Sequence, residues 1–297
     1  MRVFVFGAEG QVARSLREAA AGRSDVVLAT GGRPDVDLLN AASVEAAVAA
    51  FQPDIVVNPA AYTAVDKAET EPDSAFAVNR DGAGFVAAAA ARRGVPVIHL
   101  STDYVFDGQK ASPYSEDDVV SPKSVYGRSK LEGERAVAAA NPQHVVVRTA
   151  WVYSPFGSNF VRTMLRLAAE RDRISVVDDQ IGCPTSAADI AHGVMEIARQ
   201  LHENGWQDSR GGVLNLVGPD AMTWCDFARM IIQMQAERGG RLIPVDSISA
   251  SDYPTLASRP ANSRLSTARL NSLFGIRLPP TARSLELCLD RLTSGIN

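Results

Sequence analysis

Short runs of β-branched and other apolar residues alternate with alanine-rich stretches through the first half of the chain. Such alternation is typical of repeated βαβ units around a parallel sheet. Runs such as DIVVN and PVIHLS are apolar at nearly every position, as in strands covered by helices on both faces. The pattern predicts a doubly wound α/β fold. The expected strands cover residues 2–6, 26–30, 54–58, 96–101, 144–149 and 212–217.

Apolar residues at helical spacing fill the stretches between these strands. One such stretch, at residues 73–94, ends on Gly94, a residue typical of helix C-termini. Beyond residue 152, repeated prolines and glycines divide the chain into shorter pieces, which predicts a smaller, irregular α/β region. Helices are expected there at residues 159–170, 186–202, 223–237 and 281–292.

Composition narrows the kinds of partner that the chain can bind. Its formal net charge is −4, so it lacks a basic surface to hold nucleic acid or an acidic membrane. Its three cysteines, Cys183, Cys225 and Cys288, fit neither a disulfide framework nor a CxxC metal pair. No apolar run reaches membrane-spanning length, and no signal peptide precedes the first strand. We expect a cytoplasmic protein that binds neither nucleic acid nor membrane.

The first strand runs into the loop GAEGQVA, which places Gly7, Gly10 and Ala13 three residues apart before a helix. The first glycine permits a tight turn, the second lets backbone approach a pyrophosphate, and a small third residue allows close helix packing. The helix N-terminus offers free N–H groups to the anion. A tight strand-to-helix turn would also need glycines, but the context favours a dinucleotide site.

The sequence GGR stands after the second strand, where a ribose-binding acid would be expected. Arg33 would suit a 2′-phosphate and so favours NADPH, with NADH left open; the alternative is an exposed loop arginine that binds no ligand. Asp37 follows and would approach the adenine end. We therefore expect a dinucleotide-binding domain over residues 1–152, completed by elements within 186–217, and a substrate-binding region over 153–297.

Tyr126 and Lys130 are four residues apart on a predicted helix, so the phenol and the ammonium share one face. A nearby cation lowers the pKa of a phenol from about 10, which would make Tyr126 a usable general acid. Lys130 would also hold the nicotinamide ribose. For an isolated YxxxK pair, a half-buried tyrosine and a surface lysine would be the better explanation.

Thr102 supplies the context that favours chemistry. It ends the strand of IHLSTDYVFDG, and ligands bind at the carboxyl ends of strands in such sheets. Its hydroxyl would donate a hydrogen bond to a carbonyl or alkoxide oxygen while Tyr126 delivers a proton. The structural alternative is that Thr102 only caps a turn.

The motifs GxxGxxA, STDYVFDG and YGRSK together resemble the extended short-chain dehydrogenase/reductase superfamily, in which Thr102, Tyr126 and Lys130 correspond to the catalytic residues. Within it, NPAAYTAVDKAE, RTAWVYSPFGSNF, DDQIGCPTSAADIA and RPANSRLST look like the dTDP-4-dehydrorhamnose reductase family, over almost the full length. This resemblance implies reduction of the 4-keto group of dTDP-6-deoxy-L-lyxo-4-hexulose to dTDP-L-rhamnose.

The resemblance also implies contact residues along the whole ligand path. For the cofactor they are Gly10, Gln11 and Val12 at the pyrophosphate, Asp37 and Leu38 at the adenine end, and Ala60, Ala61 and Tyr62 at its middle. For the substrate they are Thr102, Asp103 and Trp151, with Arg259 and Arg264 meeting the nucleotide phosphates. Trp151 would offer a flat apolar wall to a deoxysugar, with a core tryptophan as the ordinary alternative.

The chain departs from the family pattern at three places. Pro59 and Ala13 replace the commoner alanine and glycine, and neither change removes a chemical group. Some relatives dimerise through acidic side chains that bind magnesium, but Ser15 stands at the matching position and cannot supply a carboxylate. We therefore predict no metal, and we leave a homodimer open.

Two alternatives stay open beside the reductase. Another nucleotide-sugar 4-ketoreductase, or an epimerase that recycles its cofactor, would use the same three residues. A binding module is the alternative from another class, because the regulatory subunit of methionine adenosyltransferase resembles this family. The intact set of Thr102, Tyr126 and Lys130 argues against it.

Overall fold

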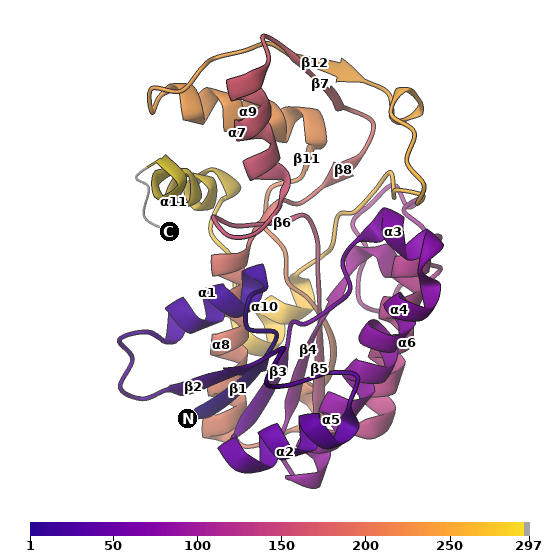
Figure 1. The fold of residues 1–297 in the computed structure, drawn as a ribbon, viewed down its shortest axis with the longest axis vertical. Helices are drawn as coiled ribbons and strands as arrows, with labels where there is room; N and C mark the ends of the chain where they lie inside the picture. The colour runs from indigo at the N-terminus through magenta and orange to yellow at the C-terminus, as the bar shows by residue number, and fades with distance from the viewer. Residues whose placement is uncertain (294–297) are drawn as a thin grey trace.

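A parallel six-stranded sheet forms the core of the protein, in a computed structural model that describes residues 1–293 (Figure 1). The strand order is β10-β5-β4-β3-β1-β2, and every neighbouring pair is parallel. Successive connections leave β1 toward opposite edges of the sheet, so the switch point, where ligands bind in such folds, lies between β1 and β3. The strands are β1 (Arg2–Phe6), β2 (Val27–Gly31), β3 (Ile55–Asn58), β4 (Val97–Thr102), β5 (His144–Thr149) and β10 (Gly212–Asn215).

These strands confirm the predicted doubly wound α/β fold. Every residue of β3 and β4 is buried, which accounts for their continuous apolar runs. Five strands lie where the sequence predicts them, to within one residue at each end. The last strand, β10, ends at Asn215 rather than at residue 217.

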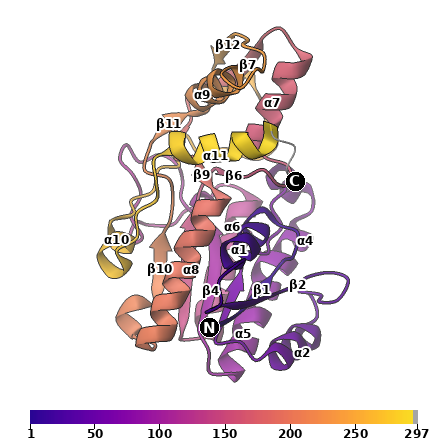
Figure 2. The same ribbon diagram turned by 90° about the vertical axis from the view of Figure 1, so that its left-hand side faces the viewer.

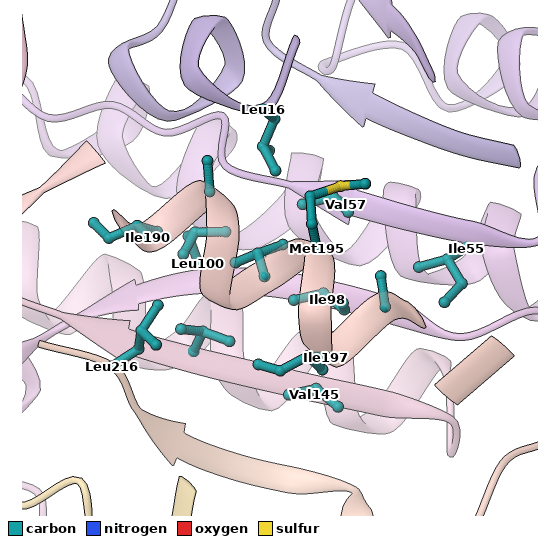
Figure 3. Close-up of a cluster of buried hydrophobic side chains, with 14 of the residues drawn as sticks. Leu16, Ile55, Val57, Ile98, Leu100, Val145, Ile190, Met195, Ile197 and Leu216 are labelled. Atoms are coloured by element: carbon teal, nitrogen blue, oxygen red, sulfur yellow. The ribbon is translucent and has the colours of Figure 1, made fainter. Parts of the chain in front are cut away.

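Helices cover both faces of the sheet. On one face lie α1 and α8, and their side chains Leu16, Ile190 and Met195 pack with strand residues in the cluster of Figure 3. The other face carries α2, α5 and α6, which pack around Phe6 and Val146. Figure 2 shows α8 lying along the sheet beside α1, although it follows residue 152 in the chain. The bounds are α1 (Gln11–Ala20), α2 (Ala41–Phe51), α5 (Ala83–Arg92), α6 (Val125–Ala140) and α8 (Ala187–Asn204).

The single helix expected over residues 73–94 is divided into α4 (Pro72–Phe76), a π-helical turn η1 (Ala77–Gly82) and α5. Asn79 lies buried in this turn and hydrogen-bonds the backbone of Tyr62 and the hydroxyl of Ser129. These partners come from elsewhere in the chain, so helical periodicity could not predict the interruption. The expected cap at Gly94 is confirmed, with φ +68° and a hydrogen bond to Ala91.

A second layer of helices and short strands stands over the carboxyl ends of the sheet (Figure 1). Its own apolar core gathers side chains from α7, α9 and α11 around Phe227 and Leu285. Its helices are α7 (Phe160–Glu170), α9 (Trp224–Ala236) and α11 (Thr281–Thr293). Two further short helices, α3 (Val65–Thr70) and α10 (Ala268–Phe274), lie outside this layer. Its paired strands are β6 (Val152–Tyr153) with β9 (Thr185–Ser186), β7 (Ile174–Val177) with β12 (Val245–Ile248), and β8 (Ile181–Gly182) with β11 (Met222–Thr223). Among residues 1–293, no helix has both the length and the apolar character needed to cross a membrane.

Candidate active site

The glycine loop lies at the switch point, against the segment that follows β3. Gly7 has φ +88°, and a Cβ there would lie 3.0 Å from the Cβ of Ala60. A Cβ at Gly10 would meet nothing within 4 Å, so this residue faces open space at the start of α1. Among residues 1–293, no side chain caps that helix N-terminus, which leaves backbone N–H groups for an anion. These features fit the pyrophosphate of a dinucleotide.

Gln11 and Val12 begin α1, but their side chains do not face an anion. The Gln11 Oε1 accepts hydrogen bonds from the Ser154 hydroxyl at 2.7 Å and the Asn159 amide at 3.0 Å. Val12 packs against the apolar core under α1. Only their backbone N–H groups remain for the predicted pyrophosphate contact, while the Gln11 side chain ties the loop to the second layer.

Beyond β2 lies a cavity of about 580 Å³, which Arg33 lines together with Glu9 and Asp35. Sequence reasoning did not anticipate these two acids, which the fold brings to the same cavity as Arg33. Arg33 is exposed and forms no hydrogen bond or ion pair with any residue of the described chain. Asp37 accepts a hydrogen bond from the Leu39 N–H at 3.0 Å and so holds its own turn.

The predicted cofactor segment Ala60–Tyr62 is held from both sides. The Ala60 N–H donates to Asn58 Oδ1 at 3.2 Å, and the Tyr62 N–H donates to Asn79 Oδ1 at 2.8 Å. The Tyr62 hydroxyl donates to Glu71 at 3.0 Å. Leu38 lies against the same π-helical turn, where its carbonyl oxygen would be 3.2 Å from a Cβ at Gly82. The backbone beside the glycine loop is thus fixed before any ligand arrives.

Thr102 ends β4 and both caps a turn and faces the candidate catalytic tyrosine. Its hydroxyl oxygen accepts from the Tyr104 N–H at 3.2 Å, which caps η2 (Asp103–Val105), and its hydroxyl donates to Asp103 at 3.1 Å. Burial raises the pKa of Tyr126, and the Thr102 side chain partly offsets that rise. To donate to a substrate, the Thr102 hydroxyl must turn away from Asp103.

Asp103 is buried with one oxygen unsatisfied. Its side chain is 4% exposed, and Oδ2 has no hydrogen-bond partner among the described residues. Burial raises the pKa of this carboxyl to about 6, against hydrogen bonds from Ser263 and Thr102 that lower it. A buried acceptor of this kind is costly unless a ligand satisfies it.

The helix α6 carries Tyr126 and Lys130 into the protein side by side. Ser124 caps the helix through the Gly127 N–H at 3.0 Å, and a Cβ at Gly127 would lie 2.3 Å from the Tyr104 carbonyl oxygen. This close approach brings the Tyr104 ring edge-on to Tyr126, with ring centres 5.4 Å apart. The two candidate residues are 9% and 2% exposed, so neither is the surface side chain of the structural alternative.

The pKa of Tyr126 differs from the sequence-based expectation. Burial raises the pKa of Tyr126 above its ordinary value of 10. The Lys130 ammonium donates to the Leu100 carbonyl at 2.7 Å and lies 3.4 Å from His99 Nε2. The expected lowering of the Tyr126 pKa by Lys130 is therefore wrong for this structure. Burial lowers the pKa of Lys130 itself to about 8.

Trp151 has a left-handed backbone conformation, with φ +50°, just beyond β5. One face of its indole stacks on Trp224 with ring centres 3.4 Å apart and planes 7° apart. The other face lies against Gly182, where a Cβ would be 2.3 Å from the ring. The expected flat wall is therefore covered on both sides, and Trp151 can offer only its edge until Trp224 moves.

The two predicted phosphate-binding arginines are engaged within the protein. Arg259 pairs with Asp66 at 2.5 Å and donates to the Tyr104 hydroxyl at 3.1 Å. Arg264 donates to Asn262 at 2.8 Å and to the Ala111 carbonyl at 2.6 Å. Either guanidinium would have to exchange protein contacts for phosphate, a competition that the sequence did not indicate.

The chain is similar to known proteins over almost its whole length. Residues 1–294 match a family model described as the RmlD substrate binding domain. The chain belongs to this RmlD family. A Sinorhizobium fredii protein named dTDP-4-dehydrorhamnose reductase is 55% identical over 279 residues, 94% of this chain and 93% of that protein.

Solved structures agree with the RmlD assignment. A dTDP-4-dehydrorhamnose reductase from Clostridium acetobutylicum is 34% identical, with a TM-score of 0.91 over 98% of this chain and 99% of that one. The Bacillus anthracis dTDP-4-dehydrorhamnose reductase, solved in complex with NADP, is 32% identical, with a TM-score of 0.88 over the same shares. The resemblance stated from sequence motifs is confirmed.

Sequence reasoning missed two buried groups in this RmlD-family site. His99 lies between Asn58 and Lys130, and its signal was a titratable residue inside an otherwise apolar strand. Glu134 forms a buried bidentate pair with Arg148, at 2.6 and 2.8 Å, one helical turn beyond Lys130. Its signal was an acid on the same face of α6 as Tyr126 and Lys130.

Proposed function

We propose that the protein reduces the 4-keto group of dTDP-6-deoxy-L-lyxo-4-hexulose with NADPH and releases dTDP-L-rhamnose. One observation carries the proposal: Thr102, Tyr126 and Lys130 lie together, buried, beside the carboxyl end of β4 in a chain of the RmlD family. The named relatives are reductases of this kind, and one was solved with NADP.

Tyr126 serves as the acid of the reaction. When bound, NADPH supplies the hydride that adds to C4 of the keto sugar. Because burial raises the pKa of Tyr126, the phenol keeps its proton at neutral pH and can donate it to the C4 oxygen as negative charge develops there. The high pKa also makes the phenol a weak acid, so the transfer depends on groups that stabilise the phenolate.

Thr102, Asp103 and Lys130 position the reacting groups. The Thr102 hydroxyl stabilises the phenolate of Tyr126 and, when turned to the substrate, the developing alkoxide. The unsatisfied Oδ2 of Asp103 accepts a hydrogen bond from a hydroxyl of the sugar. Lys130 holds the nicotinamide ribose with an N–H that its bond to Leu100 leaves free.

The cofactor preference rests on Arg33. Its guanidinium is unpaired within the described chain and lines the cavity beyond β2, where it would meet a 2′-phosphate. Glu9 and Asp35 line the same cavity and would oppose that phosphate. We favour NADPH, with weaker use of NADH.

The division of labour follows the layers of the fold. Residues 1–152, with α8 and β10, bind the cofactor over the sheet, and the rest of residues 153–297 binds the dTDP-sugar. Gln11 joins the two through Ser154 and Asn159. We therefore expect the cofactor and the sugar to bind on either side of this junction.

The direct test is the absorbance of NADPH after addition of the 4-keto sugar, with the product identified by mass and NMR. Stoichiometric NADPH loss with formation of dTDP-L-rhamnose is expected, and NADH should react more slowly. An epimerase would change the sugar without net NADPH loss. A binding module would bind NADPH and leave both compounds unchanged, and either result would contradict the proposal.

A further inference from the structure

Three buried side chains form a continuous polar chain from β3 through β4 to α6. Asn58 Nδ2 lies 3.2 Å from His99 Nδ1, and His99 Nε2 lies 3.4 Å from Lys130 Nζ. Their exposed fractions are 1%, 0% and 2%. Since water cannot substitute for these contacts, each partner sets the protonation or orientation of the next.

The backbone at Ala60 fixes the direction of this chain. The Ala60 N–H donates to Asn58 Oδ1 at 3.2 Å, so the NH₂ group of the amide is the part that faces His99. The imidazole Nδ1 must then accept, and the ring proton of the neutral imidazole lies on Nε2. That N–H faces the side-chain nitrogen of Lys130.

An imidazole N–H is matched by a lone pair, which an amine has and an ammonium lacks. The Leu100 carbonyl, at 2.7 Å, accepts from Lys130 in either state. His99 thus favours the uncharged amine while it confines Nζ beside Leu100. We propose that His99 is a positioning residue that fixes the amine of Lys130, favours its uncharged form and connects it through Asn58 to the backbone at Ala60.

The other groups around Lys130 do not duplicate this effect. Glu134, one turn further along α6, raises the pKa of Lys130, but Arg148 on β5 and Ser101 on β4 hold its carboxylate by hydrogen bonds. Burial is the larger influence and lowers the pKa of Lys130 to about 8.

The remaining neighbours leave His99 neutral. Burial, and then the charge of Lys130, lower the pKa of His99 well below 6.5. Asn79 of the π-helical turn lies near His99, because a Cβ at Gly133 of α6 would be 2.0 Å from the Asn79 carbonyl oxygen and 3.7 Å from His99 Nε2. Neither Asn79 nor Asn58 on β3 titrates. Of Asn58, His99 and Lys130, only Lys130 is therefore expected to change charge between about pH 6 and pH 10.

The inference rests on the proposed contact of Lys130 with the cofactor ribose, and NADPH binding tests it without turnover. Binding would be followed by NADPH fluorescence from about pH 6 to about pH 10 in wild type, His99→Gln and Lys130→Met. Wild type should show a midpoint near pH 8, which Lys130→Met removes. In His99→Gln, an amide oxygen can accept from the ammonium, so the midpoint should rise by about one pH unit.

Asn58→Asp is the second variant. A carboxylate at this position would accept from His99 Nδ1, move the ring proton away from Nε2 and leave Nε2 to accept from Lys130. Its midpoint should rise as well, whereas His144→Gln, at a histidine bonded to the Asn141 carbonyl away from the site, should not shift. Circular dichroism would establish that each variant folds.

A wild-type curve without the midpoint overturns the inference. So does an unshifted midpoint in folded His99→Gln, or in folded Asn58→Asp if the first variant does not fold. Failure of the proposed function has a separate signature. In that case the midpoints shift as expected, but the wild-type protein leaves the keto sugar unreduced.

Discussion

The proposed cofactor side, around the glycine loop and β4, and the proposed substrate side, around Trp151 and Arg259, are organised differently. On the cofactor side, Asn58, Asn79 and His99 are buried and hold backbone and Lys130 in place. On the proposed substrate side, two residues predicted to bind ligand are already engaged by other side chains, Trp151 by Trp224 and Arg259 by Asp66.

This difference predicts that binding the cofactor and binding the sugar nucleotide cost different amounts of free energy. On the proposed cofactor side, the glycine loop faces open space at Gly10 and the α1 N-terminus has no side-chain cap among residues 1–293, so a pyrophosphate would displace no side chain there. On the proposed substrate side, Trp151 and Arg259 would have to leave their present partners to contact the sugar nucleotide, so part of the binding free energy would be spent on that exchange. Variants on the two sides should therefore change different quantities.

The largest effect on stability is expected at Glu134. Glu134→Gln leaves the buried guanidinium of Arg148 without its counter-charge, which should lower the free energy of unfolding by about 3–5 kcal/mol. Urea denaturation would measure it. The matched control is Glu132→Gln, whose exposed pair with Arg135 should contribute less than about 1 kcal/mol. Equal losses would show that the cofactor side is not held by its buried charges.

Asp103 should make stability depend on pH. Burial raises the pKa of its carboxyl from 3.8 to about 6, so the folded state binds more protons than the unfolded state in this window. The stabilisation from Asp103 is fully present below pH 3.8 and is lost as the pH rises through about 6. The free energy of unfolding should fall by up to about 3 kcal/mol over this range.

Asp103→Asn should remove that dependence. The free energy of unfolding of the variant minus that of wild type should be larger at neutral pH than at about pH 4, as measured by denaturation at both pH values. A constant difference between variant and wild type at the two pH values would mean that Asp103 titrates normally.

Two substitutions in the glycine loop distinguish an effect on folding stability from an effect on cofactor binding. Gly7→Ala forces a side chain into φ +88° and against Ala60, which should cost about 1–2 kcal/mol of stability. Gly10→Ala meets no protein atom and should leave stability unchanged to within about 0.5 kcal/mol. It should nevertheless weaken NADPH binding, because the methyl group would face the pyrophosphate. Undiminished NADPH affinity in Gly10→Ala would contradict a pre-formed cofactor side.

Asp66 tests the proposed substrate side, with only a small expected effect on stability. Asp66→Asn frees Arg259 but keeps an acceptor for the Ala257 N–H, and the partly exposed pair should change stability by less than about 1 kcal/mol. If the pair competes with substrate phosphate, KM for the dTDP-sugar should fall with little change in kcat. A rise in KM would mean that Asp66 orients Arg259 for the substrate instead.

The contrast also explains what sequence could predict. The strands, the glycine loop and the position of Tyr126 beside Lys130 follow from periodicity within consecutive residues. The pairing of Arg259 with Asp66 joins positions 193 residues apart, and the stack on Trp151 comes from the start of α9, so neither has a local signal. The direction of the Lys130 side chain depended on His99 and Leu100 from another element, which is why the predicted lowering of the Tyr126 pKa was wrong.

The most direct measurement compares NADPH oxidation by wild type, Tyr126→Phe and Tyr104→Phe with the 4-keto sugar. Tyr104 packs edge-on to Tyr126 and is the matched control for loss of a buried phenol. We predict that Tyr126→Phe lowers kcat by about 10²-fold or more with NADPH affinity retained, and that Tyr104→Phe loses far less. Equal rates in wild type and Tyr126→Phe would contradict the assignment of Tyr126 as the acid.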